Sequence, residues 1–132
     1  MKYDPMVSPV ASKWLELDEG ERISVIAIYH KDAKIKLPNE TVHACMHAVV
    51  ENQLAEKLPV TVRALERLIA EGLDRHNAVH AIGCVVSSHI FTMMKESKQF
   101  DMAQFERDLS RLTRESWLAE YSDEDGEEIP ET

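Results

Sequence analysis

The stretch N-E-T-V-H-A-C-M-H-A-V-V-E-N-Q-L (Asn39–Leu54) decides the fold of this chain. Asn39 is a good helix N-cap. Apolar residues then recur at helical spacing at Val42, Met46 and Val49, which predicts a helix over about 40–56. The neighbouring face of this helix carries His43 and His47, because residues four apart lie one turn above each other.

A second stretch, D-R-H-N-A-V-H (Asp74–His80), repeats the arrangement of a cap followed by two histidines four residues apart. It opens a predicted helix over about 75–95, whose apolar stripe is Val79, Ile82, Val86, Ile90 and Met93. Helices are also predicted over about 19–32, 60–71 and 102–119, with short connections between them. We therefore expect an all-α fold, an up-and-down bundle of about five helices.

The chain is expected to form one domain with an acidic end. Residues 1–119 form the helical domain and begin with an irregular arm that contains Pro5 and Pro9. Residues 120–132 contain seven acidic residues and no Lys or Arg, and we expect this tail to be disordered. The net charge is −9, so removing the seven tail charges leaves −2 on the remainder, which is nearly balanced.

This charge distribution and the lack of targeting signals exclude several classes of protein. Neither part of the chain is basic, which disfavours nucleic-acid binding. No secretory signal is visible and no segment resembles a transmembrane helix, so no membrane association is expected. Cys45 and Cys84 lie among apolar residues in predicted helices, which is typical of buried thiols in a reducing compartment. We expect a cytoplasmic protein.

The two histidine pairs are the strongest chemical signal. If the helices alternate in direction, the helices over 40–56 and 75–95 run parallel, and both pairs lie at the same level of the bundle. His30 lies on the apolar face at the end of the antiparallel helix over 19–32, at that level too. Five histidines would then gather at one end, and imidazole is the commonest protein ligand of transition metals.

These residues predict a site for zinc or another divalent transition metal. His43, His47, His76 and His80 are the first-choice ligands of a tetrahedral site, with Glu51 and His30 as second choices. Glu71 and Cys84 are possible additions, whereas His89 faces nearly the opposite side. Three histidines with Glu51 as a general base would instead suit a small metal-dependent hydrolase. A metal-free polar cluster of neutral imidazoles explains the same pattern.

Other functions remain open at this point. The carboxylate pattern of di-iron bundles and the H-E-x2-H motif of zincin proteases are both absent. The main alternative to metal binding is a metal-free module for protein–protein interaction or homo-oligomer formation through exposed apolar helix faces. No nucleophile–base pair or phosphate loop indicates an enzyme, and no particular protein partner is indicated.

Three segments of the chain form a recognisable set. They are V-H-A-C-M-H-A-V-V-E-N-Q-L (Val42–Leu54), L-P-V-T-V-R-A-L-E-R-L (Leu58–Leu68) and E-G-L-D-R-H-N-A-V-H-A-I-G (Glu71–Gly83). Together they resemble a bacterial family of small all-helical cytoplasmic proteins of unknown function. The segments Y-D-P (Tyr3–Pro5) and W-L-E-L-D-E-G-E-R-I (Trp14–Ile23) are similar as well, so the resemblance spans about residues 3–95. It implies that the family's signature falls on His43, His47, Glu51, Asn52, Asp74, Arg75, His76 and His80. It implies no substrate.

Overall fold

The computed structural model describes residues 1–35 and 39–120, and this part of the chain contains helices and no strands. The helices are α1 (Ala11–Glu16), α2 (Glu19–Asp32), α3 (Glu40–Ala55), α4 (Pro59–Ala70), α5 (Arg75–Glu96), α6 (Met102–Arg111) and α7 (Arg114–Glu120). The all-α prediction is confirmed, and α2 to α6 are the substantial helices. The predicted acidic tail, apart from Glu120 at the end of α7, lies outside the described residues.

Polar side chains cap the starts of the main helices. Asp18 accepts a hydrogen bond from the backbone of Glu21, whose side chain accepts from the Asp18 backbone in return, which completes a capping box. The side chains of Asn39, Asp74 and Asp101 accept from the backbone N–H groups three residues on, at the starts of α3, α5 and α6. Gly72, with a φ of 111°, ends the turn after α4 in a conformation that favours glycine.

The single helix predicted over about 102–119 is wrong, because the chain bends between α6 and α7. Leu112 is extended, and the hydroxyl of Thr113 accepts a hydrogen bond from the Ser116 backbone while the Ser116 hydroxyl accepts from the Thr113 backbone. This reciprocal cap starts a new helix. Arg67 of α4 donates to the carbonyls of Leu109 and Leu112 at 2.8 and 2.7 Å, which satisfies the end of α6.

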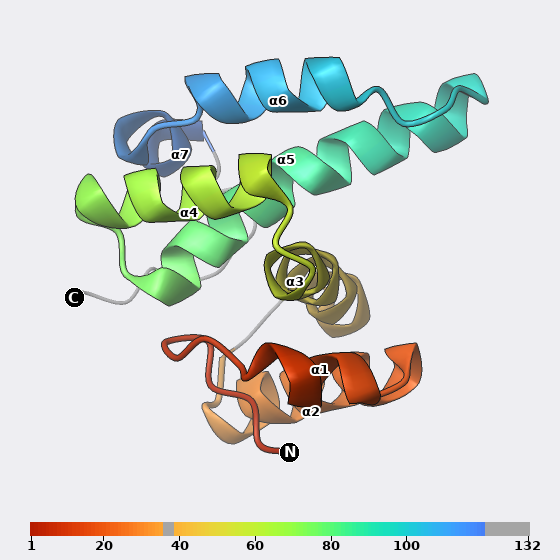
Figure 1. The fold of residues 1–132 in the computed structure, drawn as a ribbon, viewed down its shortest axis with the longest axis vertical. Helices are drawn as coiled ribbons and strands as arrows, with labels where there is room; N and C mark the ends of the chain where they lie inside the picture. Colours follow the sequence, from red (N-terminus) through yellow and green to blue (C-terminus); the bar gives the residue numbers. More distant parts are fainter. Residues whose placement is uncertain (36–38, 121–132) are drawn as a thin grey trace.

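The helices form successive layers (Figure 1). α1 and α2 lie together on one side, α3 lies next to them, and α4, α5, α6 and α7 make up the other side. α3 is seen nearly along its axis whereas α5 lies across the view, so these two helices cross. The expectation that they run parallel is therefore wrong, although the crossing still brings their histidine pairs together.

Gly83 allows α3 and α5 to approach closely at this crossing. A Cβ atom placed on Gly83 would lie 2.6 Å from Cγ of Met46 on α3, which is much closer than van der Waals contact. The absent side chain therefore allows the short distance between the helices.

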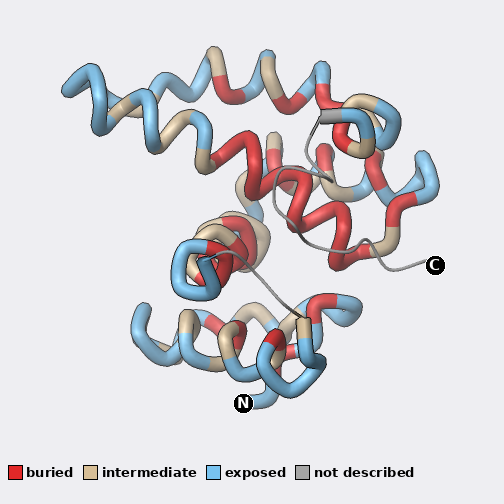
Figure 2. Tube along the Cα trace, turned by 180° about the vertical axis from the view of Figure 1, so that it is seen from behind, coloured by how far each residue is buried: buried red, intermediate tan, exposed pale blue. Residues whose placement is uncertain are grey.

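Two apolar clusters flank the crossing. One is built around α4, the first half of α5, α6 and α7, and the other joins the N-terminal arm and α1 to α2 and α3. Every residue of α5 from Arg75 to Val86 is buried, whereas the second half of the helix is mostly exposed (Figure 2). The buried half of α5 is the part that carries His76 and His80.

Within the described residues, one helix is long and apolar enough to cross a membrane by length and composition, namely α5. Of its most apolar stretch, 56% is buried inside the protein. The core helix of a helical bundle meets the same criteria, so this is weak evidence for a membrane span.

Candidate metal centre

Five histidines from three helices are buried at the junction of α2, α3 and α5. His30 comes from the last turn of α2, His43 and His47 from the first two turns of α3, and His76 and His80 from the first two turns of α5. Their exposed fractions are between 0% and 7%. The predicted convergence of both pairs and His30 is therefore present in the structure.

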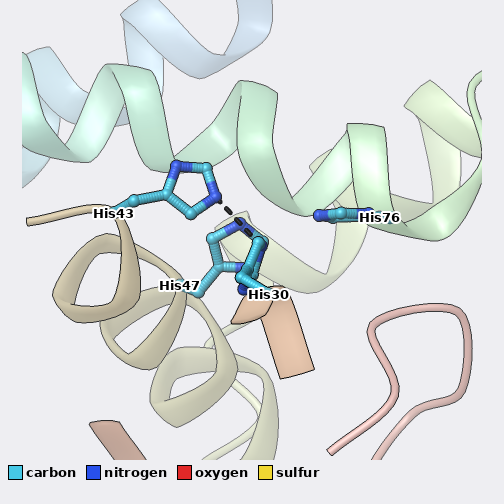
Figure 3. A group of neighbouring side chains, drawn as sticks. All are labelled: His30, His43, His47 and His76. Atoms are coloured by element: carbon cyan, nitrogen blue, oxygen red, sulfur yellow. Dashed lines mark hydrogen bonds between the residues drawn. The ribbon is translucent and has the colours of Figure 1, made fainter. Parts of the chain in front are cut away.

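Four of these histidines bring one ligand atom each into a common space. The ring nitrogens offered by His30, His43, His47 and His76 all lie within 4.8 Å of one another (Figure 3). Nε2 of His43 and Nε2 of His30 are 3.2 Å apart. His30, a second choice from the sequence, thus belongs to the closest group.

The hydrogen bonds of His30 fix its tautomer. Nδ1 lies 2.9 Å from the carbonyl oxygen of Ile26, one turn earlier in α2. A carbonyl can only accept, so Nδ1 carries the proton and donates it. In the neutral ring Nε2 then holds a lone pair that faces His43, and His43 donates across the 3.2 Å contact. A ring that donates one N–H to a backbone carbonyl and presents its other nitrogen is the arrangement typical of metal-binding histidines.

His47 is the most enclosed member. It is fully buried, and neither of its ring nitrogens has a hydrogen-bond partner within residues 1–35 and 39–120. Burial lowers the pKa of His47 well below its ordinary value. Electrostatic repulsion from His43, His76, His30 and His80, which acts when these rings are protonated, lowers it further. The ring is therefore neutral near pH 7, which is the form that binds metals.

His80 lies at the edge of the group. Its ring centroid is 4.9 Å from that of His43 and 6.1 Å from that of His47, and the ring also contacts Trp117 of α7 at 5.5 Å. It was a first-choice ligand from the sequence, but the group within 4.8 Å contains His30 in its place.

Glu51 lies outside this group because its carboxylate binds other residues. Arg75 donates to both carboxylate oxygens, at 2.7 and 2.9 Å, and the hydroxyl of Tyr3 donates to Oε2. Glu51 is almost fully buried, so these partners replace its hydration. The structure thus gives Glu51 the geometry of a buried ion pair, which differs from the ligand or general base that the sequence suggested.

Asn52, the next residue, ties the first helices to α3. Its side-chain oxygen accepts from the indole of Trp14 at 2.9 Å and from Arg22 at 3.1 Å. The segment Glu51-Asn52 near the end of α3 therefore lies where the N-terminal segment docks. Sequence reasoning missed Tyr3 and Arg75 as partners of Glu51, although a buried carboxylate always implies a nearby cation or several donors.

The remaining candidates lie elsewhere. Glu71 binds Arg67 and the backbone of Arg114 on the surface.

Nε2 of His89 is 2.7 Å from Asp108 on α6, as expected for a histidine on the opposite side of α5. Hydrogen bonds from Gln104 and His89 outweigh the effect of burial and lower the pKa of Asp108. Two cavities of about 260 and 290 Å³ adjoin His89, and none of the four clustered histidines lines either of them.

The donor set defines which chemistry the cluster supports. The group contains four imidazoles and, among the described residues within that distance, neither thiolate nor carboxylate. Nitrogen donors suit zinc, copper, nickel or cobalt, whereas magnesium and calcium prefer oxygen.

Comparisons of the chain with protein-family models, with curated proteins and with solved structures found no match. The resemblance to a bacterial helical family therefore stays an expectation, and the function has to be argued from the geometry of the site.

Proposed function

We propose that this protein binds one divalent transition-metal ion, zinc in the first instance, through His30, His43, His47 and His76. One observation carries the proposal: four buried imidazoles from three helices each place a nitrogen within 4.8 Å of the others. A tetrahedral zinc site takes four such ligands.

The distances within the cluster support this assignment. Ligand nitrogens in a tetrahedral site lie about 3.3 Å apart when the Zn–N bonds are about 2.0–2.1 Å. Nε2 of His30 and Nε2 of His43 are already 3.2 Å apart, and a metal ion would displace the proton that His43 donates between them. The other separations are at most 4.8 Å, so they exceed the tetrahedral spacing by up to about 1.5 Å, which rotation of the side chains would have to supply.

A metal-free polar cluster accounts less well for His47. An unsatisfied buried polar group costs about 1–3 kcal/mol, and His47 offers two ring nitrogens without a partner among the described residues. A metal ion would use one of them. The ring of His30 is also held in the tautomer that presents Nε2 to the cluster, as a metal ligand requires.

A structural role fits the site better than hydrolysis. Four protein ligands fill a tetrahedral zinc site, and a hydrolytic site needs an open position for water. Glu51, the general base of the hydrolytic hypothesis, is bound by Arg75 and Tyr3. We propose that the ion joins α2 to α3 and α5 and stabilises their crossing.

Metal analysis of the purified protein, loaded with zinc and then dialysed, tests the proposal. We expect one zinc per chain in the wild type and in Glu51→Gln, because Glu51 is not a ligand in this account. His47→Ala and His76→Ala should retain less than about a tenth of the zinc, because loss of a ligand weakens binding by at least the about 10–100-fold that loss of a ligand's supporting residue costs. His89→Gln is the matched control, since His89 lies outside the cluster, and it should retain one zinc. Absence of stoichiometric zinc in the wild type, or equal loss in His89→Gln, would overturn the proposal.

A second candidate function is self-association, supported by the exposed end of α5. Phe91 and Met94 are 66% and 74% exposed, which is unusual for large apolar side chains on one helix. Analytical ultracentrifugation of the wild type and of Met94→Glu tests this candidate. A dimer that Met94→Glu dissociates would support it, and a wild-type monomer at all concentrations would exclude it.

A further inference from the structure

The N-terminal arm, residues 1–10, is anchored to the same helical turns that carry the histidines. Tyr3 and Pro5 are buried. The Tyr3 hydroxyl donates to Glu51, and Arg75 donates to the carbonyl of Pro5 at 2.9 Å. Glu51 lies one turn after His47 on α3, and Arg75 directly precedes His76 on α5. Any movement of the arm is therefore transmitted to residues next to two of the four proposed ligands.

The ring of Tyr29 connects the arm to the cluster directly. It contacts Tyr3 edge-on with 6.1 Å between ring centroids, and it contacts His30 and His76 in the same way at 5.1 and 5.9 Å. One aromatic ring thus separates Tyr3 from two histidines. In Figure 3 the arm, drawn in pale red, passes on the His76 side of the cluster.

The rest of the arm is loosely held. Met6, Val7 and Val10 are at least half exposed, and the local backbone contact is a turn in which the Val7 N–H donates to the Asp4 carbonyl at 3.0 Å. The cluster around α4 to α7 contains no arm residue. The arm can therefore detach at Tyr3 and Pro5 while the rest of the core stays folded.

Detachment would change the surroundings of the cluster. It removes the Tyr3 ring from Tyr29, and it leaves the pair of Glu51 and Arg75 with water where Tyr3 and Pro5 were. Glu51 follows His47 by one turn of α3 and Arg75 directly precedes His76 in α5, so a change in the packing of this ion pair shifts the helical turns that hold two of the proposed ligands.

We propose that the N-terminal arm is a strap over the metal site, and that docking of Tyr3 and occupancy of the site stabilise each other. This inference rests on the proposed function. Coupling between two sites is reciprocal, so bound zinc must favour docking of the arm by the same factor by which the docked arm raises the affinity for zinc. Typical couplings change such equilibrium constants by factors of about 5–150.

The first test needs no variant. Trypsin can cut between Lys2 and Tyr3 only when Tyr3 leaves its buried site, and intact-mass spectrometry detects the loss of the first two residues. We expect zinc to slow this cleavage in the wild type by at least about fivefold. Cleavage after Lys98, which is exposed together with Gln99 in the connection between α5 and α6, gives an internal comparison within the same sample.

The reciprocal test measures zinc release to a chelator. Tyr3→Ala should release zinc at least about fivefold faster than the wild type, and Tyr3→Phe, which keeps the ring and loses only the hydroxyl, should show a smaller increase. Met6→Ala is the matched control because Met6 lies on the same arm and is exposed. If Tyr3→Ala does not fold, the comparison of Tyr3→Phe with the wild type replaces it.

The outcomes separate this inference from the proposed function. If the wild type binds zinc but cleavage after Lys2 and release from the Tyr3 variants are unchanged, the strap is wrong and the metal site stands. If the wild type binds no zinc, the proposed function fails and the strap fails with it.

Discussion

At the scale of single residues, His47 distinguishes a metal site from a polar cluster. It is fully buried, it carries two ring nitrogens without partners among the described residues, and it is surrounded by His30, His43 and His76. A residue that served stability alone would be satisfied by hydrogen bonds or replaced by an apolar one. In this account its cost to the metal-free fold is compensated when a metal ion binds.

We expect His47→Leu to abolish zinc binding at position 47 without lowering the stability of the metal-free protein. Leucine has similar volume and no polar atoms, so the metal-free variant should be as stable as the wild type within about 1 kcal/mol, or more stable. Zinc at 100 times its Kd should stabilise the wild type by about 2.7 kcal/mol and the variant not at all. Urea unfolding with and without zinc measures both. Equal zinc stabilisation of the two proteins would contradict the assignment of His47.

At the scale of helices, the sequence predicted the elements well and their directions poorly. Caps at Asp18, Asn39 and Asp74 are local signals, so the starts of α2, α3 and α5 could be read directly. The break at Leu112 was missed, although Thr113 followed by Ser116 three residues later is a local cap signal. The hydrogen bonds that Arg67 adds at the end of α6 come from another helix and could not be read locally. The histidines converge as expected, but through a crossing of α3 and α5 whose closeness depends on Gly83.

The crossing leads to a prediction for Gly83→Ala. Alanine favours helices by up to about 1 kcal/mol over glycine, but its Cβ would overlap Met46, and overpacking costs about 1–3 kcal/mol. We expect a net loss of about 1–2 kcal/mol in the free energy of unfolding, together with weaker zinc binding. Gly20→Ala is the control, because a Cβ there meets only Asp18, at 3.4 Å, and stability should rise or stay the same. A more stable Gly83→Ala would show that the helices do not need this close contact.

At the scale of the whole molecule, the histidine cluster and its neighbours join parts that are distant in sequence. Arg75 and Glu51 connect α5 to α3, and Tyr3 adds the N-terminal arm to them. Burial and the adjacent Glu51 carboxylate raise the pKa of Tyr3 well above its ordinary value, so its hydroxyl stays protonated and donates. The sequence contained the partners in Y-D-P and D-R-H, but contacts 24 and 48 residues apart cannot be paired without the fold.

The cluster also makes the stability of the metal-free protein depend on pH. The pKa of His47 is lowered in the folded state. The contribution of its neutral ring to the free energy of unfolding is therefore complete at pH values above the pKa of His47 in the unfolded chain, about 6.5. As the pH falls below that value the unfolded chain takes up a proton that folded His47 resists, and stability is lost by up to about 1.4 kcal/mol per pH unit. Urea unfolding between pH 7.5 and 5 should show this loss, with a shallower dependence in His47→Leu. Parallel curves for the two proteins would be inconsistent with a buried neutral His47.

X-ray absorption at the zinc edge, on protein loaded with one equivalent of zinc, tests the central claim most directly. We expect four nitrogen ligands at about 2.0–2.1 Å from the zinc, together with the outer-shell scattering of imidazole rings. A sulfur shell at about 2.3 Å, a shell dominated by water or carboxylate oxygen, or protein that retains no zinc would contradict the four-histidine site.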